Sequence, residues 1–180
     1  MIIMEKSGNI LTGGEKRIAF AVNTQGVNDA GFAGVVSRRY WPELAHIGET
    51  ELGTVLTKEV DGINFFALCC HSLEKGGWEN QEEVIKKCFD AIPGDEPVAS
   101  IAIGTGLIGV LSGADFEFIR AGMEASKKRI ILYCWQTETD NWIGQKSSYV
   151  EGENSVFFFD VTALFYMCMR LLVSKLIEST

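Results

Sequence analysis

The feature that most constrains the fold is the alternation of two kinds of apolar segment along the chain. Short runs rich in β-branched and aromatic residues are typical of buried strands, and longer segments repeat their apolar residues at helical spacing. Strand-type runs are 18–22, 54–60, 63–70, 98–103 and 129–135, and helix-type segments are 34–40, 80–92 and 114–126. Asp61-Gly62, between two of the runs, predicts a β-hairpin. The pattern therefore predicts an α/β fold with a mixed sheet.

The chain reads as a single domain over residues 1–180. Its 180 residues are about the length of one domain, and no repeat, linker or low-complexity tract divides them. With 47% hydrophobic and 22% charged residues, the chain can bury a core without disulfide or metal support.

Charge and cysteine content exclude several classes of function. The formal charge of −8 disfavours non-specific nucleic-acid binding, although backbone amides and helix N-termini can still hold a small anion. The 5 Cys include no paired CxxC motif, and only 2 His accompany them. We therefore expect no zinc site, no disulfide framework, and a reducing, cytoplasmic setting. The N-terminus lacks the pattern of a signal peptide.

Two glycine-bearing loops, residues 23–32 and 104–109, each connect a predicted strand to a predicted helix. Glycine lets the backbone approach a ligand closely, and the following helix start favours an anion. Two such loops facing each other would clamp a diphosphate. Glycines also suit tight turns that bind nothing, and the pattern of one loop does not separate the two interpretations. The second loop matches GxGxxG, the dinucleotide-binding pattern, but lies too late in the chain for a complete doubly wound sheet.

An ordered set of short motifs runs through most of the chain. It comprises 8–11 (GNIL), 23–26 (NTQG), 30–33 (AGFA), 38–44 (RRYWPEL), 78–80 (WEN), 101–107 (IAIGTGL) and 130–133 (IILY). The set resembles a macro domain, the ADP-ribose-binding module, nearest to the branch with ADP-ribose 1″-phosphate phosphatases and terminal ADP-ribose glycohydrolases. The resemblance implies a macro-domain-like three-layer α/β/α sandwich with a mixed central sheet. Residues 135–180 lie outside it and form a C-terminal strand-helix extension.

The resemblance also implies a binding site for ADP-ribose or a related nucleotide derivative, with no separate cofactor. Asn9 and Ile10 would lie beside the adenine, and Asn23 and Gln25 near the distal ribose. The proximal phosphate would contact Gly26, Ala30, Gly31 and Phe32. The other side of the diphosphate would be held by Gly104, Thr105, Gly106, Leu107, Ile108 and Gly109.

The chain departs from the family pattern at the positions that carry chemistry. Asn9 stands where an acid usually accepts the adenine amino group, and Asp29 stands where a small residue is common. The glycohydrolase branch uses a Lys and an Asp, and the matching positions here are Cys69 or Cys70, and Ile108. Hydrolysis of an ADP-ribose ester or phosphate thus has no identified catalytic residues. On an extended strand Cys69 and His71 would share a face, as a nucleophilic pair requires, but a half-buried strand thiol and a surface imidazole are the preferred interpretation.

Two other classes of function stay open. A nicotinamide-dependent oxidoreductase would need an acidic residue, such as Glu138, at the end of the strand beside the glycine loop. A structural or assembly protein with this fold would have its pocket filled, by Asp29 or by a bulky side chain.

The C-terminal region carries an apolar stretch, 156–173, that approaches membrane-spanning length. Asp160 and Arg170 interrupt it, and Asp160 is typical of a helix N-cap after the strand-like run 157–159. We therefore expect a helix outside the membrane. Because this helix would be apolar on all sides, we expect it to pair two subunits in a homodimer.

Overall fold

A computed structural model describes residues 1–74, 77–106, 109 and 112–134 of the chain. The chain forms two compact units, Met1–Gln145 and Lys146–Thr180. Every described residue belongs to the first unit. The predicted C-terminal extension, its homodimer interface and Glu138 lie outside the described residues.

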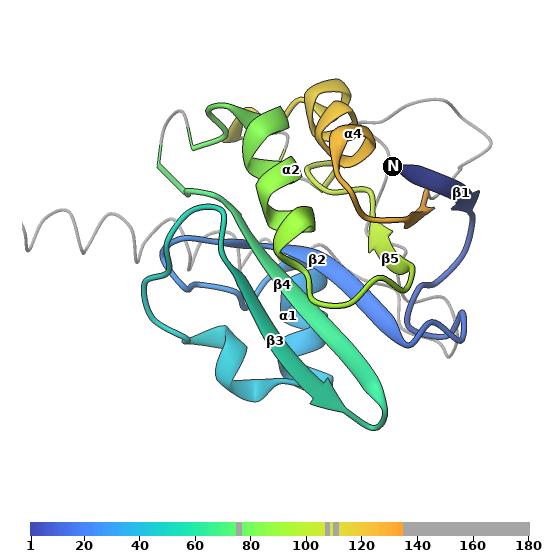
Figure 1. Ribbon diagram of the computed structural model, residues 1–180. Coiled ribbons are helices and arrows are strands. Elements are labelled where there is room, and N and C mark those ends of the chain that lie inside the picture. Colours follow the sequence, from blue (N-terminus) through green and yellow to red (C-terminus); the bar gives the residue numbers. More distant parts are fainter. Residues whose placement is uncertain (75–76, 107–108, 110–111, 135–180) are drawn as a thin grey trace, which may run out of the picture. The chain divides into compact units, whose positions relative to one another are not determined.

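The core is one six-stranded sheet (Figure 1). Its strands are β1 (Ile2–Lys6), β2 (Arg17–Asn23), β3 (Val55–Val60), β4 (Ile63–His71), β5 (Val98–Ile101) and β6 (Ile130–Tyr133). They lie in the order β1-β6-β5-β2-β4-β3, and only the β3–β4 pair is antiparallel. The predicted mixed sheet is confirmed.

The antiparallel pair is the hairpin that Asp61-Gly62 predicted. Both residues have positive φ, +52° for Asp61 and +73° for Gly62, as the commonest two-residue hairpin turns require. Strand β1 was not predicted, because Ile3 and Met4 at the sheet edge are exposed and show no alternation of apolar and polar residues.

Helices cover both faces of the sheet. They are α1 (Gly31–Arg39), α2 (Gln81–Ala91) and α4 (Phe116–Ala125), with a short 3-10 helix η1 (Pro42–Ala45) after α1. On one face Phe32 of α1 packs edge-on against Phe20 of β2, with ring centroids 5.6 Å apart. On the other face α2 and α4 pack together, and the close approach requires Gly122, since a Cβ there would lie 2.4 Å from the carbonyl oxygen of Glu82 in α2. The three-layer α/β/α sandwich is confirmed.

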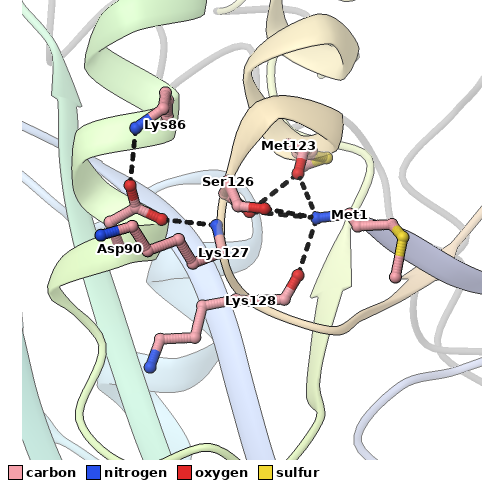
Figure 2. Close-up of polar contacts among 7 residues, drawn as sticks. All are labelled: Met1, Lys86, Asp90, Met123, Ser126, Lys127 and Lys128. Atoms are coloured by element: carbon pink, nitrogen blue, oxygen red, sulfur yellow. Dashed lines mark hydrogen bonds and ion pairs between the residues drawn. The ribbon is translucent and has the colours of Figure 1, made fainter.

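The edge strand is attached to the end of α4 by the amino group of Met1 (Figure 2). This group donates hydrogen bonds to the carbonyl oxygens of Met123 (2.8 Å), Ser126 (2.9 Å) and Lys128 (2.7 Å). A positive charge is favourable there because the last carbonyls of a helix carry partial negative charge. Burial lowers the pKa of the amino group.

Among the described residues, no helix is long and apolar enough to cross a bilayer.

Candidate nucleotide site

The two predicted glycine loops begin at neighbouring strands of the sheet. Strands β2 and β5 are parallel partners, so their carboxyl ends lie at the same edge. From β2 the chain continues through α1 toward β3 and β4, and from β5 it continues through α4 to β6 on the opposite side. The connections thus leave in opposite directions, and in open α/β sheets ligands bind outside the carboxyl ends of strands at such a point.

The first loop, residues 23–32, is held by the side chain of Asn23. Its amide donates to the carbonyl oxygen of Val27 (2.5 Å) and to Oδ1 of Asn28 (3.2 Å), and its Oδ1 accepts from the amide of Val27 (3.1 Å). Asn23 is only 5% exposed. Its polar atoms are therefore engaged within the loop, whereas the resemblance placed this residue near the distal ribose.

Gln25 connects the first loop to the residues that follow β4. Its Nε2 donates to Oγ of Ser72 (2.6 Å), and its Oε1 accepts from the amide of Leu73 (3.0 Å) and the hydroxyl of Thr24 (3.1 Å). The side chain that the resemblance assigned to the ribose thus bonds the protein itself.

The glycines of the first loop differ in what surrounds them. Gly26 has φ +70°, and a Cβ there would lie 2.0 Å from the carbonyl oxygen of Gly48, so packing alone requires glycine. Gly31, with φ +58°, has no heavy atom of the described chain within 4 Å of the corresponding position. Ala30 is the N-cap of α1 and supplies no side-chain hydrogen bond to the first amides of this helix. Asp29 is exposed, and it is not the N-cap residue of α1. Its carboxylate is therefore not directed away from the loop by bonding to the first amides of this helix.

The second loop shows the same contrast. A Cβ on Gly104 would lie 2.5 Å from Cδ1 of Ile119, and one on Gly109 would lie 2.3 Å from the carbonyl oxygen of Gly104. Thr105 is buried and donates to the carbonyl oxygen of Ala102 (2.7 Å). Gly106 is exposed with no heavy atom of the described chain within 4 Å of its Cβ position. Leu107 and Ile108 lie outside the described residues.

The adenine candidates form a turn after β1. Oδ1 of Asn9 accepts a hydrogen bond from the amide of Leu11 (2.9 Å). The resemblance gave this same oxygen the role of accepting a hydrogen bond from the adenine amino group. Ile10 is buried in the core.

The end of β4 differs from the sequence expectation. Sγ of Cys70, and not of Cys69, lies near Nδ1 of His71 (3.8 Å), while Sγ of Cys69 lies 2.8 Å from Oγ1 of Thr50. The register shift beside Asn23, where β2 pairs with this end of β4, interrupts the regular alternation of side chains. His71 is buried, not a surface imidazole, and burial lowers its pKa to about 4. Burial also raises the pKa of the Cys70 thiol well above its usual range, so at neutral pH both groups are uncharged.

One contact was not foreseen from the sequence. Trp78, expected to be core or rim packing, donates from Nε1 to Oγ of Ser112 (2.7 Å) at the exit of the second loop. No local pattern pairs residues 34 positions apart; only the packing of α2 against α4 brings them together. Within the described ranges, no group of three or more His, Cys, Asp or Glu side chains could hold a metal ion.

Comparison with known proteins identifies the fold. No protein-family profile and no curated protein matches the sequence. Among solved structures, the macrodomain of Mycobacterium tuberculosis DarG is similar with TM-score 0.54 and 19% identity over 74% of this chain and 97% of that chain. The macrodomain of Thermus aquaticus DarG gives 0.50 and 17% identity over 74% and 97%. An alphavirus P23pro-zbd structure gives 0.53 and 17% identity over 74% of this chain, which spans only 22% of its length. The chain has the macrodomain fold.

Proposed function

We propose that the chain binds ADP-ribose or a related nucleotide derivative, with the diphosphate between the two glycine loops. The observation that carries the proposal is the open space at Gly31 and Gly106, one on each loop, at the carboxyl ends of neighbouring parallel strands. At Gly26, Gly104 and Gly109 a nearby protein atom leaves no room for a side chain, which explains why glycine is there. At Gly31 and Gly106, the absence of a side chain leaves room that a ligand can use.

In the proposal, phosphate binding depends on the backbone, because residues 23–32 and 104–109 include no Lys or Arg. The start of α1 supplies amide groups and the positive end of a helix dipole, which together favour a phosphate. In the proposal, Gly31 and Gly106 leave room for the diphosphate, while the hydrogen bonds of Asn23 and Gln25 fix the conformation of the first loop. Asn9 and Ile10 remain the candidates beside the adenine.

The proposal is for binding without turnover of carboxylate-linked ADP-ribose. The positions that match the hydrolase Lys are Cys69 and Cys70, both buried with raised thiol pKa values. A neutral, protonated thiol supplies neither the charge nor the base of that chemistry. Release of ADP-ribose beyond one equivalent per protein, from a carboxylate-linked substrate, would contradict this part.

The topology favours this proposal over the nicotinamide-dependent oxidoreductase. In a dinucleotide-binding sheet the GxGxxG loop follows the first strand of the doubly wound unit. Here it follows β5, the fifth strand of a sheet with an antiparallel edge. The open space at Gly31 and Gly106 likewise favours a working pocket over a structural protein whose pocket is filled.

Thermal shift with ADP-ribose, NAD, NADP and AMP tests the proposal. ADP-ribose at a hundred times its Kd should stabilise the fold by about 2.7 kcal/mol. For a chain of this size that raises Tm by roughly 5 to 10 °C. Gly106→Val should abolish the shift. Thr57→Val, the control, places valine at an exposed position of β3 and should retain it. No shift with any of the four nucleotides at millimolar concentration would refute the proposal.

A further inference from the structure

The second glycine loop is attached at its exit to the residues that begin α2. Nε1 of Trp78 donates to Oγ of Ser112 (2.7 Å), and Nε2 of Gln81 donates to the carbonyl oxygen of Gly113 (3.2 Å). Oε1 of Gln81 accepts from the amide of Asp115, the N-cap residue of α4 (2.7 Å). Two side chains from outside the loop therefore fix the point where it enters α4.

The bond from Trp78 extends into the glycine motif. Oγ of Ser112 donates in turn to the carbonyl oxygen of Gly109 (3.1 Å). At the other end of the motif, Cη2 of the same indole lies 3.9 Å from the Cβ position of Gly104. One side chain thus lies beside the first glycine of the motif and is hydrogen-bonded, through Ser112, to the last.

Trp78 is itself held in place. Its ring is stacked on the imidazole of His71, with centroids 4.5 Å apart and planes 1° from parallel, and it is only 5% exposed. His71 is the last residue of β4, so the stacking fixes the position of the indole relative to the sheet. A loop that is ordered before binding loses less conformational entropy when the ligand arrives, which strengthens binding without any new contact.

We propose that Trp78 is a positioning residue of the diphosphate site, holding Gly104 by contact and Gly109 through Ser112 in the arrangement that leaves Gly106 open to the phosphates. The inference rests on the proposed function and adds a residue that does not touch the ligand. It requires that loss of the indole N–H affect the phosphate part of the ligand and not the nucleoside part.

The test uses two variants that remove opposite ends of one hydrogen bond. Trp78→Phe keeps an aromatic ring against His71 and removes the donor, and Ser112→Ala removes the acceptor. Calorimetry should show each weakening ADP-ribose binding about fivefold to tenfold, as expected for a partly buried hydrogen bond. The double variant should be little weaker than Ser112→Ala alone, because Ser112→Ala already removes the bond from Trp78 together with the bond to Gly109. Adenosine, which has no phosphate, should bind all variants within about twofold of wild type.

Trp41→Phe is the matched control. Trp41 is equally buried, at 5% exposed, but precedes η1 in the connection from β2 to β3, and not in the connection from β5 to β6 that contains the second loop. The same loss of an indole there should leave ADP-ribose affinity unchanged. Equal weakening by Trp78→Phe and Trp41→Phe, or equal weakening of ADP-ribose and adenosine, would overturn the positioning role.

Hydrogen exchange on the ligand-free protein separates this inference from the proposed function. Trp78→Phe and Ser112→Ala should speed amide exchange across residues 104–109 at least fivefold, and Trp41→Phe should not. If wild type fails to bind ADP-ribose but the exchange result holds, the proposed ligand is wrong and the positioning of the loop stands. If wild type binds and exchange at residues 104–109 is unchanged in both variants, the positioning role is wrong and the proposed function stands.

Discussion

The two glycine loops occupy equivalent places at the carboxyl ends of β2 and β5, yet they are held in opposite ways. The first is ordered from within, because Asn23 bonds Val27 and Asn28, its neighbours in sequence. The second is ordered from outside, by Trp78 and Gln81 at the start of another helix. The first conformation therefore depends in part on neighbours in sequence, besides the bonds from Gln25 to the residues after β4, whereas the exit of the second is held by residues at the start of α2.

The largest expected effect lies in the first loop. Gly26→Ala places a Cβ 2.0 Å from the carbonyl oxygen of Gly48 at φ +70°. Because backbone strain and overpacking add, the free energy of unfolding should fall by about 4 kcal/mol. Gly31→Ala is the control, with a similar φ of +58° but open space, and should cost about 1 kcal/mol. Urea denaturation measures both; equal losses would show that φ alone, and not the contact with Gly48, requires glycine at position 26.

Acid should weaken the support of the second loop. Burial lowers the pKa of His71, which stacks on Trp78, from 6.5 to about 4. Between these values the unfolded chain binds a proton that the folded chain does not, so this contribution is complete above pH 6.5 and is lost as pH falls toward 4. It amounts to about 3 kcal/mol.

His71→Phe keeps a ring against Trp78 and removes the titration. Unfolding free energies at pH 7 and pH 4 should therefore differ less in the variant than in wild type, by about 3 kcal/mol. Carboxylates elsewhere titrate in both proteins and cancel in this difference. The same pH dependence in both proteins would show that His71 is not buried in its neutral form.

The same contrast explains what the sequence could predict. The hairpin at Asp61-Gly62, the strand–helix alternation and both loop positions depend on local patterns, and the structure contains them. Strand β1 was missed because Ile3 and Met4 face solvent at the sheet edge. The pairing of side chains at the end of β4 was wrong because a register shift between strands leaves no trace in the sequence of either one.

The candidate site divides in the same way. Which glycines face open space, and which face a backbone atom, is decided by segments distant in sequence, such as Gly48 beside Gly26. Asn23 and Gln25 lie in the predicted loop, but nothing in the sequence shows that their amides bond the protein itself. Local reasoning therefore located the loops without assigning the roles of their side chains.

A smaller effect should follow from removing one anchor of each loop. Asn23→Ala leaves the amide and the carbonyl oxygen of Val27 without their side-chain partner at a partly buried position, and should cost about 2 kcal/mol. Ser112→Ala removes the bonds to Trp78 and Gly109 at a half-buried position, where water can replace part of them, and should cost about 1 kcal/mol. Denaturant titration gives both values. A greater loss for Ser112→Ala would reverse the view that the first loop depends more on its own side chain.

The smallest effect on the fold should come from Gly106→Ala. The residue is exposed, its φ lies outside the left-handed region, and no heavy atom of the described chain lies within 4 Å of the Cβ position. A change at such a surface position is expected within about 0.5 kcal/mol of wild type. Gly26→Ala and Gly106→Ala thus make the same chemical change in the two loops, and denaturation should separate them by more than about 3 kcal/mol. A comparable loss at both positions would mean that Gly106 is constrained by the protein, and the open space beside it would no longer argue for a ligand.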